Sequence, residues 1–517
     1  VISQFPGQVS AAAARRAGGV DWLRYMRGPT DLRGSLTMRN KRVDLVVDST
    51  LQGLAVNLPA PFTKTAAEVL PLRLERRYTG PQQERIAVAV EGLVSAVLLR
   101  RSEAQETRLE RGTVRFGEGA APEPDRAGIV VSGAIKNLDF NEWLALTGES
   151  GDGGALNLAA VDLRIAEMRV FERRFADLAI RATSPGGALQ ATVRGRDIDG
   201  TLGWRAQGKG RLTARLRRLN LPVAESSVTA PTAQAADARS PELPALDVVV
   251  DELLLAERSL GRLELQATPQ QRDWRIERMQ LITPESQLSV DGVWQNWLTQ
   301  PRVQANVQLL VNDVGRLLTR LGYPEGVRRG TAKIEGNLAW AGSPQRLDYP
   351  TLTGNFVLDA AKGQFLKLDP GIGKLLGILS LQSLPRRITL DFRDIFSDGL
   401  AFDEIVGAIK VVKGVASTDN LRIVGPAARI SMGGQVDLAR ETQKLRVKVS
   451  PQLSDTLSVA GALIGGPIAG VAAFVAQKLL KDPLDQIAAY EYDVTGTWVE
   501  PVVAKVERPQ ANPESAP

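Results

Sequence analysis

The chain has 517 residues, with 64 Lys or Arg and 58 Asp or Glu, which gives a formal net charge of +6. This small surplus does not indicate a nucleic-acid-binding protein, and aromatic residues, at 5%, are too few for base-stacking platforms. The chain contains no Cys and no His, which excludes thiolate nucleophiles, the Ser-His-Asp arrangement and the usual zinc sites. We therefore expect no catalytic residues, no metal and no cofactor.

Apolar and polar residues alternate in many short segments, which is the pattern of half-buried antiparallel β-strands. Clear examples lie at residues 43–48, 161–165, 178–182, 263–265, 388–393, 445–449 and 490–498. Gly, Asn and Asp residues punctuate the chain about every ten residues, as turns between strands do. The pattern predicts a mainly β chain with a long antiparallel sheet that has one apolar face.

Two longer-range features suggest how these strands are organised. Residues 174–183 align with residues 259–268 at an offset of 85, which indicates repeated β-meander units. Residues 220–245 are rich in Pro, Ser, Ala and Thr and show no periodicity, so they are typical of a flexible loop or linker.

Helical signals are few. Residues 312–321 carry apolar side chains at helical spacing after Asn312, the expected N-cap. Residues 370–384 follow a good helix start at Asp369-Pro370, and residues 469–481 end before Pro483. We expect these helices to lie mainly towards the C-terminus.

Residues 459–476 form an uncharged segment of eighteen residues, a length that suggests a membrane span. Four Gly, six Ala and Pro467 make this segment weakly hydrophobic for a solitary span. Three interpretations stay open: a buried helical hairpin over one end of a sheet, a segment that contacts a membrane surface, and a spanning helix. The residues expected at a membrane surface are Leu463, Ile464, Ile468, Val471 and Phe474.

Motifs for chemistry are missing or incomplete. The sequence Gly371-Ile372-Gly373-Lys374 resembles a phosphate-binding loop only superficially, because Leu375 stands where that loop needs Ser or Thr. The adjacent carboxylates of Asp403-Glu404 would point to opposite faces of a strand and form no catalytic pair. With so few helices, the apolar face must close on itself, pack on a second sheet, or remain an open groove.

The chain resembles the AsmA-like proteins, most closely their YhdP branch. The strongest resemblance is carried by residues 371–392, 402–403, 418–421, 434–438, 460–472, 477–486 and 490–498. Earlier residues also match the branch, among them Gly53, Lys64, Trp143, Tyr323 and Trp340. The resemblance therefore covers nearly the whole chain, apart from residues 220–245.

The resemblance implies a fold and a function. Members of the family are anchored in the inner membrane of Gram-negative bacteria and cross the periplasm. Their fold is a repeating β-groove, a long twisted trough of antiparallel strands with an apolar interior. They are implicated in moving phospholipid from the inner to the outer membrane and in keeping the outer membrane a barrier. This chain would be the periplasmic part near the outer membrane, with any anchor upstream of Val1.

On this basis we divide the chain into five parts. These are β-groove repeats at 1–219, a flexible linker at 220–245, a further repeat at 246–350, a C-terminal AsmA-like region at 351–507 with a helical segment at 453–486, and a disordered tail at 508–517.

Alternation and resemblance together predict a lipid-binding groove whose apolar side chains hold acyl chains. The residues expected to line it are Leu163, Ile165, Leu178, Ile180, Leu263, Leu265, Ile388, Leu390 and Phe392. The expected partner is phospholipid, together with the inner and outer membranes, and no nucleic acid. The alternative is a non-conducting periplasmic scaffold for outer-membrane assembly, with a sheet filled by its own side chains.

Overall fold

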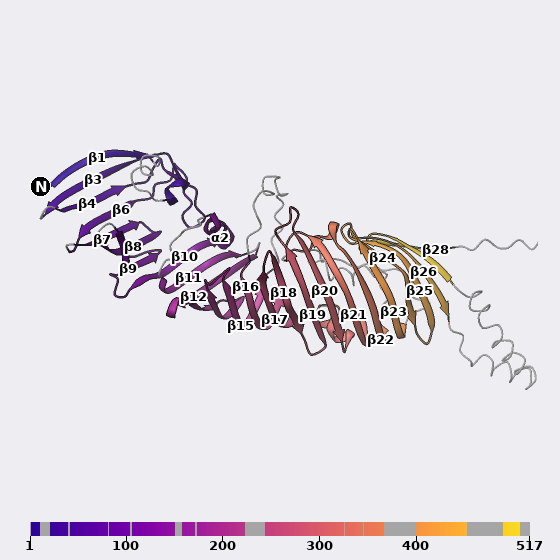
Figure 1. Ribbon diagram of the computed structural model, residues 1–517. Helices are drawn as coiled ribbons and strands as arrows, with labels where there is room; N and C mark the ends of the chain where they lie inside the picture. The colour runs from indigo at the N-terminus through magenta and orange to yellow at the C-terminus, as the bar shows by residue number, and fades with distance from the viewer. Residues whose placement is uncertain are drawn as a thin grey trace, which may run out of the picture. The chain divides into compact units, whose positions relative to one another are not determined.

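The computed structural model describes residues 2–10, 21–39, 42–80, 82–103, 106–149, 158–170, 173–222, 243–324, 326–344, 346–366, 400–451 and 490–506. Contacts within the chain divide it into two units, Val1–Glu257 and Arg258–Pro517. Each unit contains a long sheet of many strands that lie side by side in chain order (Figure 1). The predicted fold class, a mainly β chain with a long sheet and few helices, is confirmed.

In the first unit, each strand of the sheet pairs with the next strand of the sheet along the chain. The strands are β1 (Ile2–Ser10), β3 (Pro29–Arg39), β4 (Arg42–Ser49), β6 (Leu72–Tyr78), β7 (Gln83–Val90), β8 (Val94–Glu103), β9 (Glu106–Phe116), β10 (Gly128–Asp139), β11 (Leu158–Val170), β12 (Arg173–Thr183), β13 (Leu189–Arg194), β14 (Ile198–Arg205), β15 (Arg211–Leu221) and β16 (Ala245–Leu255). Two short strands, β2 (Met26–Arg27) and β5 (Ala55–Val56), pair with each other outside this sheet.

The sheet of the first unit is not antiparallel throughout, which corrects the prediction. Strand β10 runs parallel to both β9 and β11, and β15 runs parallel to β16. Parallel neighbours need a connection that returns to the starting end of the first strand, so each of these pairs has a long link. Residues 117–127 link β9 to β10, and α2 (Phe140–Glu149) begins the link from β10 to β11.

The third long link contains most of the predicted linker. Strand β15 extends to Leu221 and β16 begins at Ala245, so both ends of the segment 220–245 belong to strands. Residues 223–242 lie outside the described residues. The described residues of the first unit also include two 3-10 helices, η1 (Asp21–Tyr25) and η2 (Pro185–Gly187).

In the second unit, neighbouring strands are antiparallel and follow chain order. They are β17 (Arg258–Gln270), β18 (Asp273–Ile282), β19 (Ser286–Gln295), β20 (Arg302–Val311), β21 (Val327–Ala341), β22 (Thr353–Phe365), β23 (Leu400–Val412), β24 (Val415–Val424), β25 (Ala428–Asp437), β26 (Thr442–Pro451), β27 (Tyr490–Gly496) and β28 (Pro501–Lys505). The predicted strands at 263–265, 445–449 and 490–498 correspond to β17, β26 and β27. The one predicted at 388–393 lies outside the described residues.

The second unit also contains α3 (Val314–Arg320) and the 3-10 helix η4 (Tyr349–Thr351). Helix α3 confirms the helix predicted at 312–321, but its N-cap is Asp313 and not Asn312. The Asp313 carboxylate accepts the backbone N–H of Arg316 at 2.9 Å, the bond that defines an N-cap. The sequence did not predict α2. The helices predicted at 370–384, 453–486 and 469–481 fall outside the described residues.

Candidate functional site: the apolar face of the sheet

Directly opposed residues on paired strands share a face of the sheet, so the strand register shows which side chains lie together. In the first unit, one row crosses every strand of the sheet and contains apolar residues only. In strand order it is Phe5, Gly34, Val47, Leu74, Val88, Ala96, Val114, Val131, Val161, Ala182, Ala191, Leu202, Ala214 and Val248. We call this side of the sheet the apolar face of the first unit.

Four of the predicted groove residues lie on this face, next to that row. Leu163 lies opposite Ile180, and Ile165 lies opposite Leu178, on the antiparallel pair β11 and β12. Leu163 and Ile180 are half-buried. By contrast, Ile165 and Leu178 are only 2% and 1% exposed, because they pack with Ile135, Phe175 and Val193 in one hydrophobic cluster. The sequence prediction placed these four residues on one face, but it could not foresee this difference in burial.

The second unit has an equivalent apolar face. One row on it runs Leu263, Leu281, Leu288, Leu309, Ile334, Leu358 and Gly407. Leu421 lies beside Gly407, and the row continues through Met432, Val447 and Tyr492. The predicted groove residues Leu263 and Leu265 both lie on this face, with Leu265 opposite Met279.

Most side chains in these rows are half-buried, and Met432, at 7% exposed, is one of the exceptions. Neighbours on the same face cover part of each side chain, and the two-stranded sheet of β2 and β5 is the one other sheet among the described residues. A strip of apolar surface therefore runs across the strands of each unit. Such a strip is unfavourable in water, because uncovered apolar surface costs about 25 cal/mol per Å².

Three phenylalanine rings on these faces pack over glycines of the neighbouring strand. Phe5, Phe356 and Phe402 lie opposite Gly34, Gly336 and Gly363, respectively. A Cβ added at Gly34 would lie 2.1 Å from the Phe5 ring, and one at Gly363 would lie 2.4 Å from the Phe402 ring. Each glycine therefore leaves room for a phenylalanine ring directly beside the backbone.

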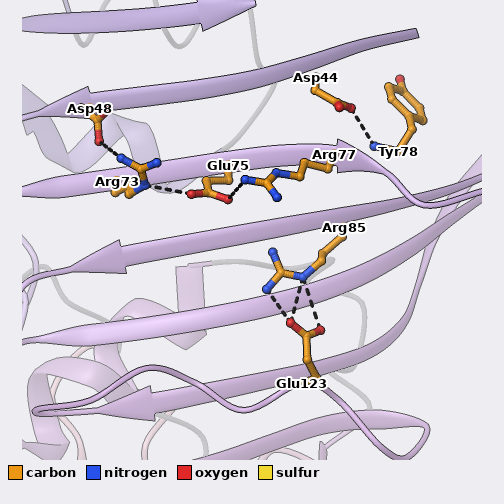
Figure 2. A network of polar contacts seen from close by, with 8 residues as sticks. All are labelled: Asp44, Asp48, Arg73, Glu75, Arg77, Tyr78, Arg85 and Glu123. Carbon is orange, nitrogen blue, oxygen red and sulfur yellow. Dashed lines mark hydrogen bonds and ion pairs between the residues drawn. The ribbon is translucent and has the colours of Figure 1, made fainter. Parts of the chain in front are cut away.

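The opposite face of the sheet is polar in both units. In the first unit, Arg73 bonds Asp48 at 3.0 Å and Glu75 at 2.8 Å, and Glu75 also pairs with Arg77 at 2.9 Å (Figure 2). The hydrogen bond from Arg73 lowers the pKa of Glu75. Arg85 binds Glu123 of the β9–β10 link with Nε and Nη2, so that link lies on the polar face (Figure 2). In the second unit, a polar row runs Glu264, Gln280, Ser289, Gln308 and Glu335.

Local segments cover parts of each apolar face. In the first unit, Phe62 of the β4–β6 insertion (residues 50–71) packs edge-on against Phe116 and Trp143, with ring centroids 6.0 and 5.9 Å apart. The Trp143 indole N–H donates to the carbonyl of Ala60 at 2.8 Å. In the second unit, Leu318 of α3 packs in one cluster with Val327, Ala360 and Phe402.

The remaining predicted site residues cannot be placed. Ile388, Leu390 and Phe392 of the groove, and Leu463, Ile464, Ile468, Val471 and Phe474 of the membrane contact, lie outside the described residues. In the part of the chain that the structure describes, no helix is long and apolar enough to span a membrane. No cluster of acidic side chains suited to a metal ion occurs there either, and the pairs Asp251-Glu252 and Asp403-Glu404 are exposed.

Sequence analysis missed one polar feature of the apolar face. On β6, β7 and β8, the apolar alternation gives way to Arg76, Glu84 and Arg100, which lie close together once the strands pair. The signal was present, because each strand changes from apolar to charged residues at one end of its alternating run. It could be recognised only with the strand register.

Comparison with known proteins identifies the family of the chain. The family described as "YhdP protein" matches residues 1–503, so the chain belongs to the YhdP family, as the resemblance indicated. The chain is 25% identical over 477 residues to "Intermembrane phospholipid transporter YhdP" of Escherichia coli (strain K12). The alignment covers 90% of this chain and 37% of that relative, so the chain spans little more than a third of the relative's length. No solved structure matches the chain.

Proposed function

We propose that this chain is a periplasmic segment of a phospholipid carrier, and that the apolar face of each unit binds acyl chains. The observation that supports this most strongly is the apolar row that crosses every strand of the sheet in the first unit and runs from β17 to β27 in the second, opposite a face of charged and polar residues. The E. coli relative is named as an intermembrane phospholipid transporter, which fits the same substrate class. On this proposal, the carrier moves lipid between the inner and outer membranes and so supports the outer-membrane barrier.

The energetics favour acyl chains as the ligand. Each CH₂ group that leaves water contributes about 0.8 kcal/mol, so a two-chain lipid lying along a row is held by many small contributions. Because successive rows are chemically similar, a lipid that moves along the face exchanges one apolar contact for another. The movement needs no bond chemistry, so the chain does not have to be an enzyme.

The predicted groove residues would have two different roles. Leu163, Ile180, Leu263 and Leu265 are half-buried and offer surface to a ligand. Ile165 and Leu178 are almost fully covered and would support the floor beneath it. Ile388, Leu390 and Phe392 keep their predicted role in the groove.

The buried pair Ile165 and Leu178 also favours a second candidate, the non-conducting scaffold. Where a face is filled by its own side chains, no lipid is needed to complete the fold. A scaffold of this kind would be fully folded and free of lipid when purified.

Lipid co-purification with a matched pair of variants tests the proposal. The 517-residue chain is expressed in a bacterial periplasm, and its bound lipid is counted by native mass spectrometry and organic extraction. Leu265→Asp places a carboxylate in the acyl path and should reduce bound phospholipid at least about fivefold, equivalent to about 1 kcal/mol.

The control is Gln266→Asp, one residue further along β17, on the polar face opposite Arg278. This variant should retain the lipid content of the unaltered protein, and circular dichroism should show both variants folded. A folded, unaltered protein that carries no lipid would contradict the proposal and favour the scaffold.

A further inference from the structure

The apolar face of the first unit ends in a polar cluster at one margin. Tyr78 of β6 lies opposite Glu84 of β7, and Glu84 lies opposite Arg100 of β8. Arg76 lies two residues before Tyr78 on β6 and opposite Ile86 of the apolar face. We call Arg76, Tyr78, Glu84 and Arg100 the rim cluster, because apolar side chains of the same three strands adjoin it on the same face.

A buried carboxylate organises the rim cluster. Arg76 Nε lies 2.6 Å from one oxygen of Glu84, and Arg100 Nε lies 3.3 Å from the other. The Glu84 side chain is only 5% exposed, whereas those of Arg76 and Arg100 are 42% and 39% exposed. The carboxylate is therefore covered, and the two guanidinium groups that bind it reach solvent.

The guanidinium groups have donors to spare. Arg76 Nη2 donates to the Tyr78 hydroxyl at 2.7 Å, and within the described residues Arg100 contacts Glu84 alone through its Nε. A guanidinium has five N–H donors in a planar fork that matches two oxygens of a phosphate group. The Arg100 side chain is 39% exposed and Tyr78 is 36% exposed, so the Nη groups of Arg100 and the Tyr78 hydroxyl are accessible to a ligand.

The charges near the cluster leave a positive balance. Arg42 lies 5.8 Å from the centre of the Tyr78 ring and donates to the carbonyl of Gly80, and Asp44 accepts the backbone N–H of Tyr78 (Figure 2). Within the rim cluster itself, two guanidinium groups, Arg76 and Arg100, pair with one carboxylate, Glu84. The charge of the cluster is 2 − 1 = +1. An anion bound here would be attracted by the positive charge and would accept hydrogen bonds from the free guanidinium N–H groups.

We propose that the rim cluster binds the phosphate group of a lipid whose acyl chains lie on the adjoining apolar face. This inference rests on the proposed function, which it deepens by naming a headgroup site. A net charge of +1 favours an anionic headgroup over a zwitterionic one, since the ammonium of the latter would be repelled. Free phosphate offers the same oxygens and is the second source that the test must separate.

The test measures which lipids the 517-residue chain takes from vesicles with equal amounts of phosphatidylglycerol and phosphatidylethanolamine. The unaltered chain should enrich phosphatidylglycerol about threefold over its share in the vesicles. Arg100→Gln should abolish the enrichment and leave the total lipid bound unchanged, because Arg76 still pairs with Glu84. Arg100→Lys keeps the charge but loses the fork, and should give partial enrichment.

The matched control is Arg77→Gln. Arg77 follows Arg76 on β6, points to the polar face and pairs with Glu75 at 2.9 Å, so its loss should leave the enrichment intact. A parallel titration of the lipid-free chain with inorganic phosphate separates the two sources. The cluster would be a site for free phosphate if the unaltered chain binds inorganic phosphate, Arg100→Gln does not, and the unaltered chain shows no enrichment of phosphatidylglycerol.

The results distinguish this inference from the proposed function. An unaltered chain that takes up no lipid overturns the proposed function. A chain that takes up lipid of the same composition in all four proteins, and binds no phosphate, overturns the rim-cluster site alone. Should Arg100→Gln fail to fold, the comparison between Arg100→Lys and Arg77→Gln decides the question, because only the first should lower the enrichment.

Discussion

Lys64 shows how a single side chain can organise a segment that packs on the apolar face. It is 4% exposed, and its ammonium donates to the carbonyls of Leu51 at 2.7 Å, Leu54 at 2.9 Å and Thr65 at 2.9 Å. Burial lowers the pKa of Lys64, and these carbonyl contacts offset part of the cost of burying a charge. The β4–β6 insertion, which brings Phe62 against Phe116, therefore depends on one cation.

Replacing this cation should loosen the insertion. Lys64→Met keeps a long side chain but leaves three carbonyl oxygens without that donor, at about 1–3 kcal/mol for each buried group left unsatisfied. We expect faster hydrogen exchange at the Gly53 and Val56 amides, which bond the carbonyls of Ala66 and Lys64. Lys136→Met, at an exposed position on β10, should leave both amides unchanged. Slow exchange in Lys64→Met would show that the cation is dispensable.

At the scale of the element, α3 is held over the apolar face of the second unit by a charged contact. Arg320, in its last turn, pairs with Glu285 of the β18–β19 turn, with Nη2 2.8 Å from Oε1 and Nε 2.9 Å from Oε2. The hydrogen bond from Arg320 lowers the pKa of Glu285 below its ordinary value of 4.5. A depressed carboxylate pKa means that the contact stabilises the fold above about pH 4.5 and is lost as pH falls through the folded pKa.

Acid should therefore release α3. As pH falls from about 4.5 through the folded pKa of Glu285, the protection factors of the Leu317 and Leu321 amides should fall about fivefold, or about 1 kcal/mol. Glu285→Gln should show this loosening already at neutral pH and respond less to acid. Glu335→Gln, on the polar face of β21, serves as the control and should behave like the unaltered chain. If Glu285→Gln matched the unaltered chain at every pH, packing alone would hold the helix.

Sequence patterns predicted the elements better than their connections. Alternation in β4, β11, β12 and β17 placed each strand and its apolar side, because a period of two residues is imposed by the backbone. The parallel pairs at β10 and at β15–β16 were missed, since strand direction depends on the length and path of a link and not on alternation. The predicted N-cap, Asn312, is one residue away from the observed one, Asp313, because Asn and Asp are both good N-cap residues.

At the scale of the whole molecule, the sequence predicted a mainly β chain with an apolar face and identified the family. It could not predict which residues of that face are covered. Leu163 and Ile165 occupy equivalent positions in the alternating pattern, yet only Ile165 is buried in the cluster that includes Phe175 and Val193. It also could not predict the rim cluster, because Arg76, Glu84 and Arg100 meet only through the register of three strands. The burial of a side chain and the register of a strand both depend on the neighbouring strands, so they cannot be predicted from the sequence of one strand.

The central claim is that acyl chains contact one face of the sheet in both units. The most direct measurement is photo-crosslinking in living bacteria, with a photoreactive amino acid placed at Leu163 or Leu263 on the apolar face. Asp162 and Arg262, each one residue earlier on the polar face, provide matched controls. We predict phospholipid adducts at residues 163 and 263 and none at residues 162 and 262. Equal labelling of both faces, or labelling of neither, would contradict the account.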